Sequence, residues 1–175
     1  MNRFLTPAEK VASKQLAKEQ KLCRWCGLDV KRFSTKRSSF CSEACVHEFL
    51  LRSDASYIRH YIAKRDKYTC QLCGLDCKGF VKRLRRYVQG RRLELPPIMS
   101  NTHYTQQRKE LEEEYFASLG MEYVNTNSRS TFYDIDHITS VSEGGGQCGE
   151  DNLRLLCLSC HRKETAKLKQ RLASQ

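Results

Sequence analysis

The stretch YDIDHI at residues 133–138 opens the part of the chain that decides the fold. The surrounding residues 131–141 are rich in β-branched and aromatic side chains and predict a strand. Three glycines follow at 144–146, and residues 153–157 are a short apolar run typical of a second strand. Residues 160–172 are basic and predict a closing helix. A strand, a glycine-rich loop, a second strand and a helix would bring distant polar side chains together.

Several polar side chains of this segment are candidates for a catalytic site. Asn152 lies fifteen positions after His137, and His161 lies nine positions after Asn152. Asp136 precedes His137 directly, so the two side chains point to opposite faces of a strand unless its backbone is kinked. An isolated Asp-His pair is usually an ordinary surface pair, but its register with the other residues favours a catalytic site. Asp134 is interpreted as a solvated carboxylate, and a group that supports the site residues is the alternative.

Eight of the ten cysteines form pairs separated by two or three residues. Such spacing lets a tight turn aim two sulfurs at one ion, and four thiolates are a common zinc ligand set. The pattern predicts two structural zinc sites, the first made by Cys23, Cys26, Cys41 and Cys45 and the second by Cys70, Cys73, Cys157 and Cys160. The second site joins pairs with 83 residues between them, so it would tie the two ends of a domain together.

The two remaining cysteines are Cys77 and Cys148. We interpret both as ordinary small side chains, although Cys77 in place of Cys73 is an alternative ligand. The units Cys23–Gly27 and Cys70–Gly74 both read CxxCG, which predicts two zinc knuckles of one kind.

The charge of the chain points to a polyanionic partner. Lys and Arg number 31 against 20 Asp and Glu, for a net charge of +11. Residues 78–92 hold seven basic residues and no acid. We expect phosphate contacts from this segment and from the last helix, through Lys82, Arg83, Arg85, Arg86, Arg91, Arg92, Arg162 and Lys163. A solvated face or a nuclear-import signal at 82–92 is the alternative.

Composition excludes several protein classes. The apolar fraction is 39%, too low for one large core, and no apolar run is long enough to span a membrane. Residues 1–20 lack the apolar core of a secretory signal. We therefore expect an intracellular protein with reduced cysteines, which favours metal over disulfides. Its expected place is the nucleus in a eukaryote and otherwise the cytoplasm.

The rest of the chain is expected to be largely helical. Residues 5–20 predict a capped helix, residues 42–66 a helical stretch broken near Ser53, and residues 104–119 another helix. The expected division has residues 1–54 as a helix and four-cysteine zinc finger. Residues 55–175 would then be the second domain, with a basic insertion at 78–130.

The motifs resemble the HNH family of nucleases, which have a ββα-metal fold. The shared features are an Asp-His-Ile first strand, a glycine-rich loop, Asn-Leu-x-x-Leu-Cys-x-x-Cys-His and an upstream Cys-x-x-Cys-Gly, within residues 68–77 and 131–165. Residues 41–73 and 136–161 also look like the C-terminal nuclease module of zinc-finger-containing annealing helicases. The resemblance implies an α+β fold with a small ββα-metal core and a four-cysteine zinc knuckle, preceded by a helix and a zinc finger.

The resemblance also implies roles. His137 would be the general base, while Asp136 and His161 would hold one catalytic Mg²⁺ or Mn²⁺. Asn152 would bond to the loop backbone and orient His137. The implied activity is metal-dependent endonucleolytic hydrolysis of DNA, duplex or branched, with structure-specific cleavage in repair or replication as its setting.

Two other functions compete with this one. The chain is alternatively a nucleic-acid-binding module stapled by zinc, without catalysis of its own. Residues 21–50 could also dock a protein, and a helicase or a replication factor is the partner that the resemblance suggests.

Overall fold

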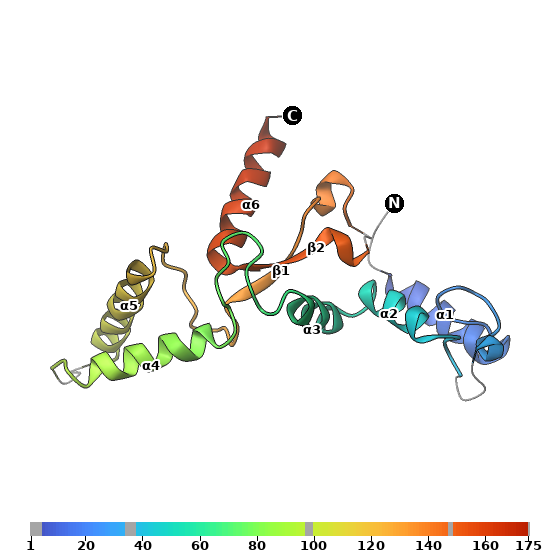
Figure 1. Cartoon of the computed structure of the whole chain (residues 1–175), viewed down its shortest axis with the longest axis horizontal. Helices are drawn as coiled ribbons and strands as arrows, with labels where there is room; N and C mark the ends of the chain where they lie inside the picture. The colour runs from blue at the N-terminus through green and yellow to red at the C-terminus, as the bar shows by residue number, and fades with distance from the viewer. Residues whose placement is uncertain (1–4, 34–37, 97–99, 147–148, 175) are drawn as a thin grey trace. The chain divides into compact units, whose positions relative to one another are not determined.

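The computed structural model describes residues 5–33, 38–96, 100–146 and 149–174 (Figure 1). The helices are α1 (Pro7–Glu19), α2 (Glu43–Leu51), α3 (Ala55–Arg65), α4 (Phe80–Arg92), α5 (Asn101–Ser118) and α6 (Leu158–Ala173). The strands β1 (Tyr133–His137) and β2 (Leu153–Cys157) pair in a two-stranded sheet. This is the small α+β fold that the sequence predicts. None of the helices described here is long and apolar enough to cross a membrane.

Local capping signals place the ends of the N-terminal helices where the sequence predicts them. Thr6 caps α1 in a capping box: its hydroxyl accepts the Glu9 N–H at 3.2 Å, and its own N–H donates to the Glu9 carboxylate at 2.6 Å. The predicted break lies between α2 and α3. There the Asp54 carboxylate accepts the N–H groups of Ser56 and Tyr57 at 2.8 and 2.9 Å.

Two elements differ from the expectation. The sequence pattern predicts no element for the segment that forms α4, whose buried side chains are Phe80, Val81, Leu84 and Val88. The first strand ends at His137, so its predicted extension to residue 141 is wrong. The reason is local: the Ser140 hydroxyl accepts the Glu143 N–H at 3.2 Å and starts a 3₁₀ turn, η2 (Val141–Glu143).

The chain divides into two compact units, and the boundary crosses both strands. Unit 1 comprises Met1–Arg65 and Ile135–Arg154, and unit 2 comprises Asp66–Asp134 and Leu155–Gln175. The expected domain boundary at residues 54 and 55 stays a prediction.

Each unit has its own apolar core. In unit 1, the buried side chains of Leu51, Ile58, Ile62 and Leu153 pack together, which fixes α3 against the start of β2. In unit 2, the rings of Phe80 and Phe132 stack with centroids 3.9 Å apart. The Phe116 ring meets both edge-on, at 5.6 and 5.5 Å, and so joins α4, α5 and the segment before β1.

Candidate active site

The loop between the two strands is folded around Asn152, the last residue of the 3₁₀ turn η3 (Glu150–Asn152). The Asn152 side-chain oxygen accepts the Thr139 N–H at 2.7 Å, and its amide nitrogen donates to the carbonyls of Thr139 and Gly145, both at 3.0 Å. Its backbone carbonyl accepts the Ile138 N–H at 2.9 Å. Asn152 therefore bonds to the loop backbone as expected, starting at the residue after His137.

Gly145 leaves no room for a side chain. A Cβ atom there would lie 1.9 Å from the Thr139 carbonyl oxygen and 2.7 Å from the Asn152 amide nitrogen. The Gly145 N–H also donates to the Ser140 carbonyl at 2.9 Å. Close approach of backbone and amide is thus the reason for a glycine here.

We expect Gly145→Ala to destabilise the chain by about 1–3 kcal/mol, because the methyl group would push the Thr139 carbonyl and the Asn152 amide apart. The matched control is Gly149→Ala in the same loop, where an added Cβ has nothing within 4 Å. Urea unfolding of both variants measures the difference. Equal free energies of unfolding for the two variants would contradict the close approach.

Arg65, the last residue of α3, holds the turn that carries Asn152. Its guanidinium donates to the Glu150 carbonyl at 2.6 Å and to the Leu153 carbonyl at 2.5 Å. One carbonyl belongs to the first residue of the turn and the other to the residue after it, so α3 supports the loop from outside the motif. No spacing in the sequence singles out this arginine.

Asp136 is ion-paired with a residue that the motif does not contain. Its Oδ2 atom accepts a hydrogen bond from Nε of Arg154 at 3.0 Å and lies 2.9 Å from Nη2 of Arg154. Both side chains are 17% exposed. Arg154 is the one charged residue of the apolar strand LRLLC. That position was the available signal, because a charged residue in a buried strand needs a partner.

His137 is the last residue of β1 and is half-buried. Unit 1 therefore brings together Asp136, His137 and Asn152: two adjacent strand residues, and the amide that organises the loop after them. This arrangement can hold an imidazole and a carboxylate in fixed places.

His161 belongs to unit 2, in the first turn of α6. Its Nδ1 atom lies 3.9 Å from Oδ2 of Asp134, and the same oxygen pairs with Nη1 of Arg129 at 2.9 Å. The interpretation of Asp134 as a solvated carboxylate is therefore wrong. Its side chain is only 17% exposed, because the segment that leads into β1 brings Arg129 to it.

The first four-cysteine group is assembled in unit 1 and could hold a metal ion. The sulfurs of Cys23, Cys26, Cys41 and Cys45 all lie within 4.8 Å of one another. Cys41 is 3.5 Å from both Cys26 and Cys45. A tetrahedral zinc site with bonds of about 2.3 Å has sulfurs about 3.8 Å apart, so the group fits this ion.

The second four-cysteine group lies in unit 2 and brings together the two cysteine pairs that the sequence predicts to share one ion. The sulfurs of Cys70, Cys73, Cys157 and Cys160 lie within 4.8 Å of one another. Cys157 ends β2, and its sulfur is 3.7 Å from that of Cys73. A hydrogen bond with Cys157 lowers the pKa of Cys70 to about 4 and raises that of Cys157. Cys70 is thus prepared to bind a metal as the thiolate.

Cys77 lies outside the second group, and the alternative in which it replaces Cys73 is not what the structure has. Its buried sulfur is 3.5 Å from the Leu75 carbonyl, and burial raises its pKa to about 12. Cys77 is thus a small core side chain, as interpreted. Cys148 lies outside the described residues.

The two knuckles have the same backbone. The Cys23 and Cys70 N–H groups bond to the carbonyls of Leu28 and Leu75, at 2.7 and 2.9 Å. In each knuckle the turn between the cysteine and the leucine needs a glycine, because φ is +70° at Gly27 and +73° at Gly74. The prediction of two knuckles of one kind is confirmed.

The basic residues expected to bind nucleic acid lie on two helices of unit 2. Most are exposed: Lys82, Arg83, Arg85 and Arg86 on α4, and Arg162 and Lys163 on α6. Two of the set are ion-paired. Arg83 is 3.3 Å from the Asp76 carboxylate, and Arg91 pairs with Glu94 and Glu114. Arg92 is half-buried against Tyr104.

Comparison with known proteins agrees with this geometry. Residues 125–167 match the family model described as HNH endonuclease. Over 133 residues the chain is 37% identical to the bovine "DNA annealing helicase and endonuclease ZRANB3" and 35% identical to the mouse protein of that name. Each alignment covers 74% of this chain and 11% of the relative. The chain thus spans about a tenth of the length of these relatives.

The crystal structure of the human ZRANB3 HNH domain is a structural neighbour. It is 27% identical, with a TM-score of 0.39, and the match covers 69% of this chain and 96% of that one. The family model, the relatives and the residues around Asn152 agree. The chain therefore contains an HNH endonuclease domain at residues 125–167.

Proposed function

We propose that the chain is a metal-dependent DNA endonuclease that hydrolyses phosphodiester bonds. The observation that carries the proposal is the loop that Asn152 ties together directly after His137, within the segment that matches the HNH endonuclease family. The hydrogen bonds of Asn152 hold the backbone next to His137 in place, and an isolated Asp-His pair on a strand has no such support.

His137 acts as the general base. The free ring nitrogen of a neutral imidazole can take a proton from the water that attacks the phosphorus. Asn152 is a positioning residue: its bonds to Thr139 and Gly145 hold the backbone that follows the histidine. Arg65 supports the same turn through the Glu150 and Leu153 carbonyls.

Asp136 and His161 are the proposed ligands of one Mg²⁺ or Mn²⁺. Asp134 and Asp136 alternate along β1 and so share a face of the strand, and the His161 ring lies near the Asp134 carboxylate. A divalent cation would supply charge stabilisation at the scissile phosphate and the leaving oxygen. Arg154 holds the Asp136 carboxylate in place.

The remaining assignments complete the proposal. The two four-cysteine groups hold structural zinc, because a closed four-sulfur site leaves no position for substrate. The basic side chains of α4 and α6 hold the DNA backbone without reading its sequence. A helicase or a replication factor is the proposed further partner. The proposed setting is structure-specific cleavage in repair or replication, in the nucleus of a eukaryote and otherwise in the cytoplasm.

Labelled fork and duplex oligonucleotides test the proposal. The zinc-loaded chain, at low salt, is mixed with each DNA in Mg²⁺, in Mn²⁺ and without either ion. We expect cleavage only when one of the ions is added, and cleavage of the fork in preference to the duplex would indicate structure specificity. DNA binding without cleavage under any of these conditions would favour the binding module instead.

A further inference from the structure

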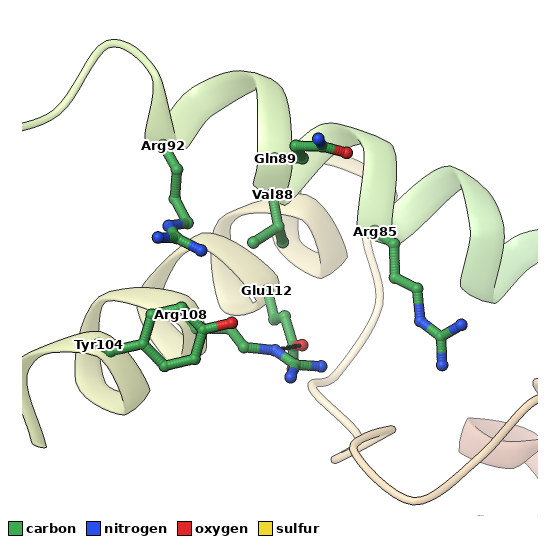
Figure 2. Close-up of a pocket in the computed structure, with 7 residues that line it drawn as sticks. All are labelled: Arg85, Val88, Gln89, Arg92, Tyr104, Arg108 and Glu112. Atoms are coloured by element: carbon green, nitrogen blue, oxygen red, sulfur yellow. Dashed lines mark hydrogen bonds and ion pairs between the residues drawn. The ribbon is translucent and has the colours of Figure 1, made fainter. Parts of the chain in front are cut away.

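The insertion forms a pocket that the proposed active site does not use. Helices α4 and α5 lie side by side in unit 2 and enclose about 340 Å³ (Figure 2). Sites for small molecules begin at roughly 300 Å³, so the hollow can admit a group the size of one nucleotide. Its walls are made by three arginines, one tyrosine, one valine and one glutamate among others: Arg85, Val88, Arg92, Tyr104, Arg108 and Glu112.

The pocket is positively charged although Glu112 lines it. The Glu112 side chain is only 2% exposed, and its oxygens accept hydrogen bonds from Nε of Arg108 at 2.8 Å and from the Tyr123 hydroxyl at 3.2 Å. Arg108 and Glu112 therefore neutralise each other. Among the described residues that line the pocket, Glu112 is the one carboxylate, so the charges of Arg85 and Arg92 remain in the pocket.

Arg92 is held in the wall of the pocket by an aromatic ring. Its guanidinium lies over the Tyr104 ring, 4.5 Å from the centroid (Figure 2). Its Nε atom is buried and has no hydrogen-bond partner in the part of the chain that the structure describes. A buried donor without a partner is unfavourable, and a small movement of the guanidinium toward an anionic oxygen in the pocket would satisfy it.

Arg85 faces the same pocket from one side of α4. Its guanidinium donates to the Arg129 carbonyl at 3.3 Å, which fixes its direction while the side chain stays exposed. Arg85 and Arg92 are seven positions apart on α4, about 10 Å along its axis, so each guanidinium would meet a phosphate of its own, and Val88 and the Tyr104 ring form an apolar wall of the pocket.

We propose that this pocket binds one nucleotide of an unpaired DNA strand, with the phosphates on its two sides on Arg85 and Arg92 and its sugar and base against Val88 and Tyr104. Sites for single strands combine cationic and aromatic side chains in this way. A duplex keeps its nucleotides stacked and paired, so it cannot place one inside the hollow. The inference rests on the proposed function for its DNA substrate, and it adds a hold on the unpaired arm of a branched DNA.

The test measures binding in the His137→Ala background, so that no DNA is cut. Fluorescence anisotropy follows a labelled twenty-nucleotide single strand, and the blunt duplex of that length, against Arg92→Ala and Arg85→Ala. The control is Lys109→Ala, which removes one exposed charge from α5 outside the pocket. Circular dichroism and zinc content check the fold, and exposed Arg85 provides a variant that need not disturb packing.

We expect Arg92→Ala and Arg85→Ala each to weaken single-strand binding about tenfold, because each removes charged hydrogen bonds to a phosphate. The slope of log affinity against log salt should become shallower by about 0.7 for each phosphate that the variant no longer neutralises. The Lys109→Ala variant should stay within about twofold of its parent.

Three outcomes would overturn the inference. The first is equal affinity of the pocket variants and Lys109→Ala for the single strand. The second is an equal loss of affinity for single strand and duplex. A parallel titration uses free deoxyadenosine monophosphate. The third outcome is that the pocket variants lose binding to this nucleotide but keep their binding to the single strand, which would make the pocket a site for free nucleotides. Because binding is measured on an inactive background, these outcomes are separate from the test of cleavage.

Discussion

Removal of zinc is expected to unfold the chain and not only to abolish its activity. The first group holds together a small cluster in which Cys23, Val30 and Cys41 are the buried members. The second group ties the knuckle at Cys70 to the end of β2 at Cys157. Structural zinc contributes about 10–16 kcal/mol to the folding of small domains, as much as the whole stability of many proteins.

The measurement is a chelator titration followed by circular dichroism and by the fluorescence of Trp25, the single tryptophan of the chain. Trp25 lies between two cysteines of the first group, so its emission reports on that group. The metal released should amount to two zinc ions per chain. The same experiment on Cys157→Ser should show loss of the second ion.

The matched control for the zinc prediction is Cys77→Ser. Cys77 is buried next to the second knuckle but lies outside the group, so the variant should still hold two zinc ions. A ratio near one zinc per wild-type chain would contradict one of the two assignments. A chain that keeps its helix content after complete zinc removal would contradict the structural role of both.

The second large effect is expected from His137→Ala. Loss of a general base lowers a rate by about 10²–10⁴-fold, and here the base acts on the attacking water itself. DNA affinity should stay within about twofold, because the proposed contacts to the DNA backbone come from basic side chains on α4 and α6. Single-turnover cleavage and anisotropy on one labelled oligonucleotide measure the two quantities together.

The control is His60→Ala, which removes an exposed histidine on α3, in the same unit as His137. It should leave both the rate and the affinity unchanged. If His137→Ala lost binding together with cleavage, His137 would be a structural residue and the base would have to be sought elsewhere.

The cysteine pattern predicted both four-cysteine groups because thiol spacing is a short-range property of a knuckle. The Cys70 and Cys157 pairs come together although 83 residues intervene. Helix α4 was not predicted, because its helical pattern is hard to see in the sequence. Its apolar positions, such as Phe80, Leu84 and Val88, are interrupted by basic residues, so charge dominated the pattern.

The candidate site was only partly predictable. The bonds of Asn152 to the loop were predicted from the resemblance to the HNH family, which implies that this residue bonds to the loop backbone. The pairing of Asp136 with Arg154 depends on the register between two strands, which spacing along the chain does not specify. Arg65 lies farther from the motif, and only the packing of α3 brings it to the loop.

The most direct test of the central claim is nicking of a supercoiled plasmid by the purified, zinc-loaded chain in Mg²⁺. His137→Ala, prepared identically, is assayed in parallel to exclude a contaminating nuclease. The proposed function predicts nicked circles with the wild-type chain alone, and resealing of those nicks by DNA ligase, because family chemistry leaves 5′-phosphate and 3′-hydroxyl ends. Absence of nicking, or equal nicking by both proteins, would contradict it.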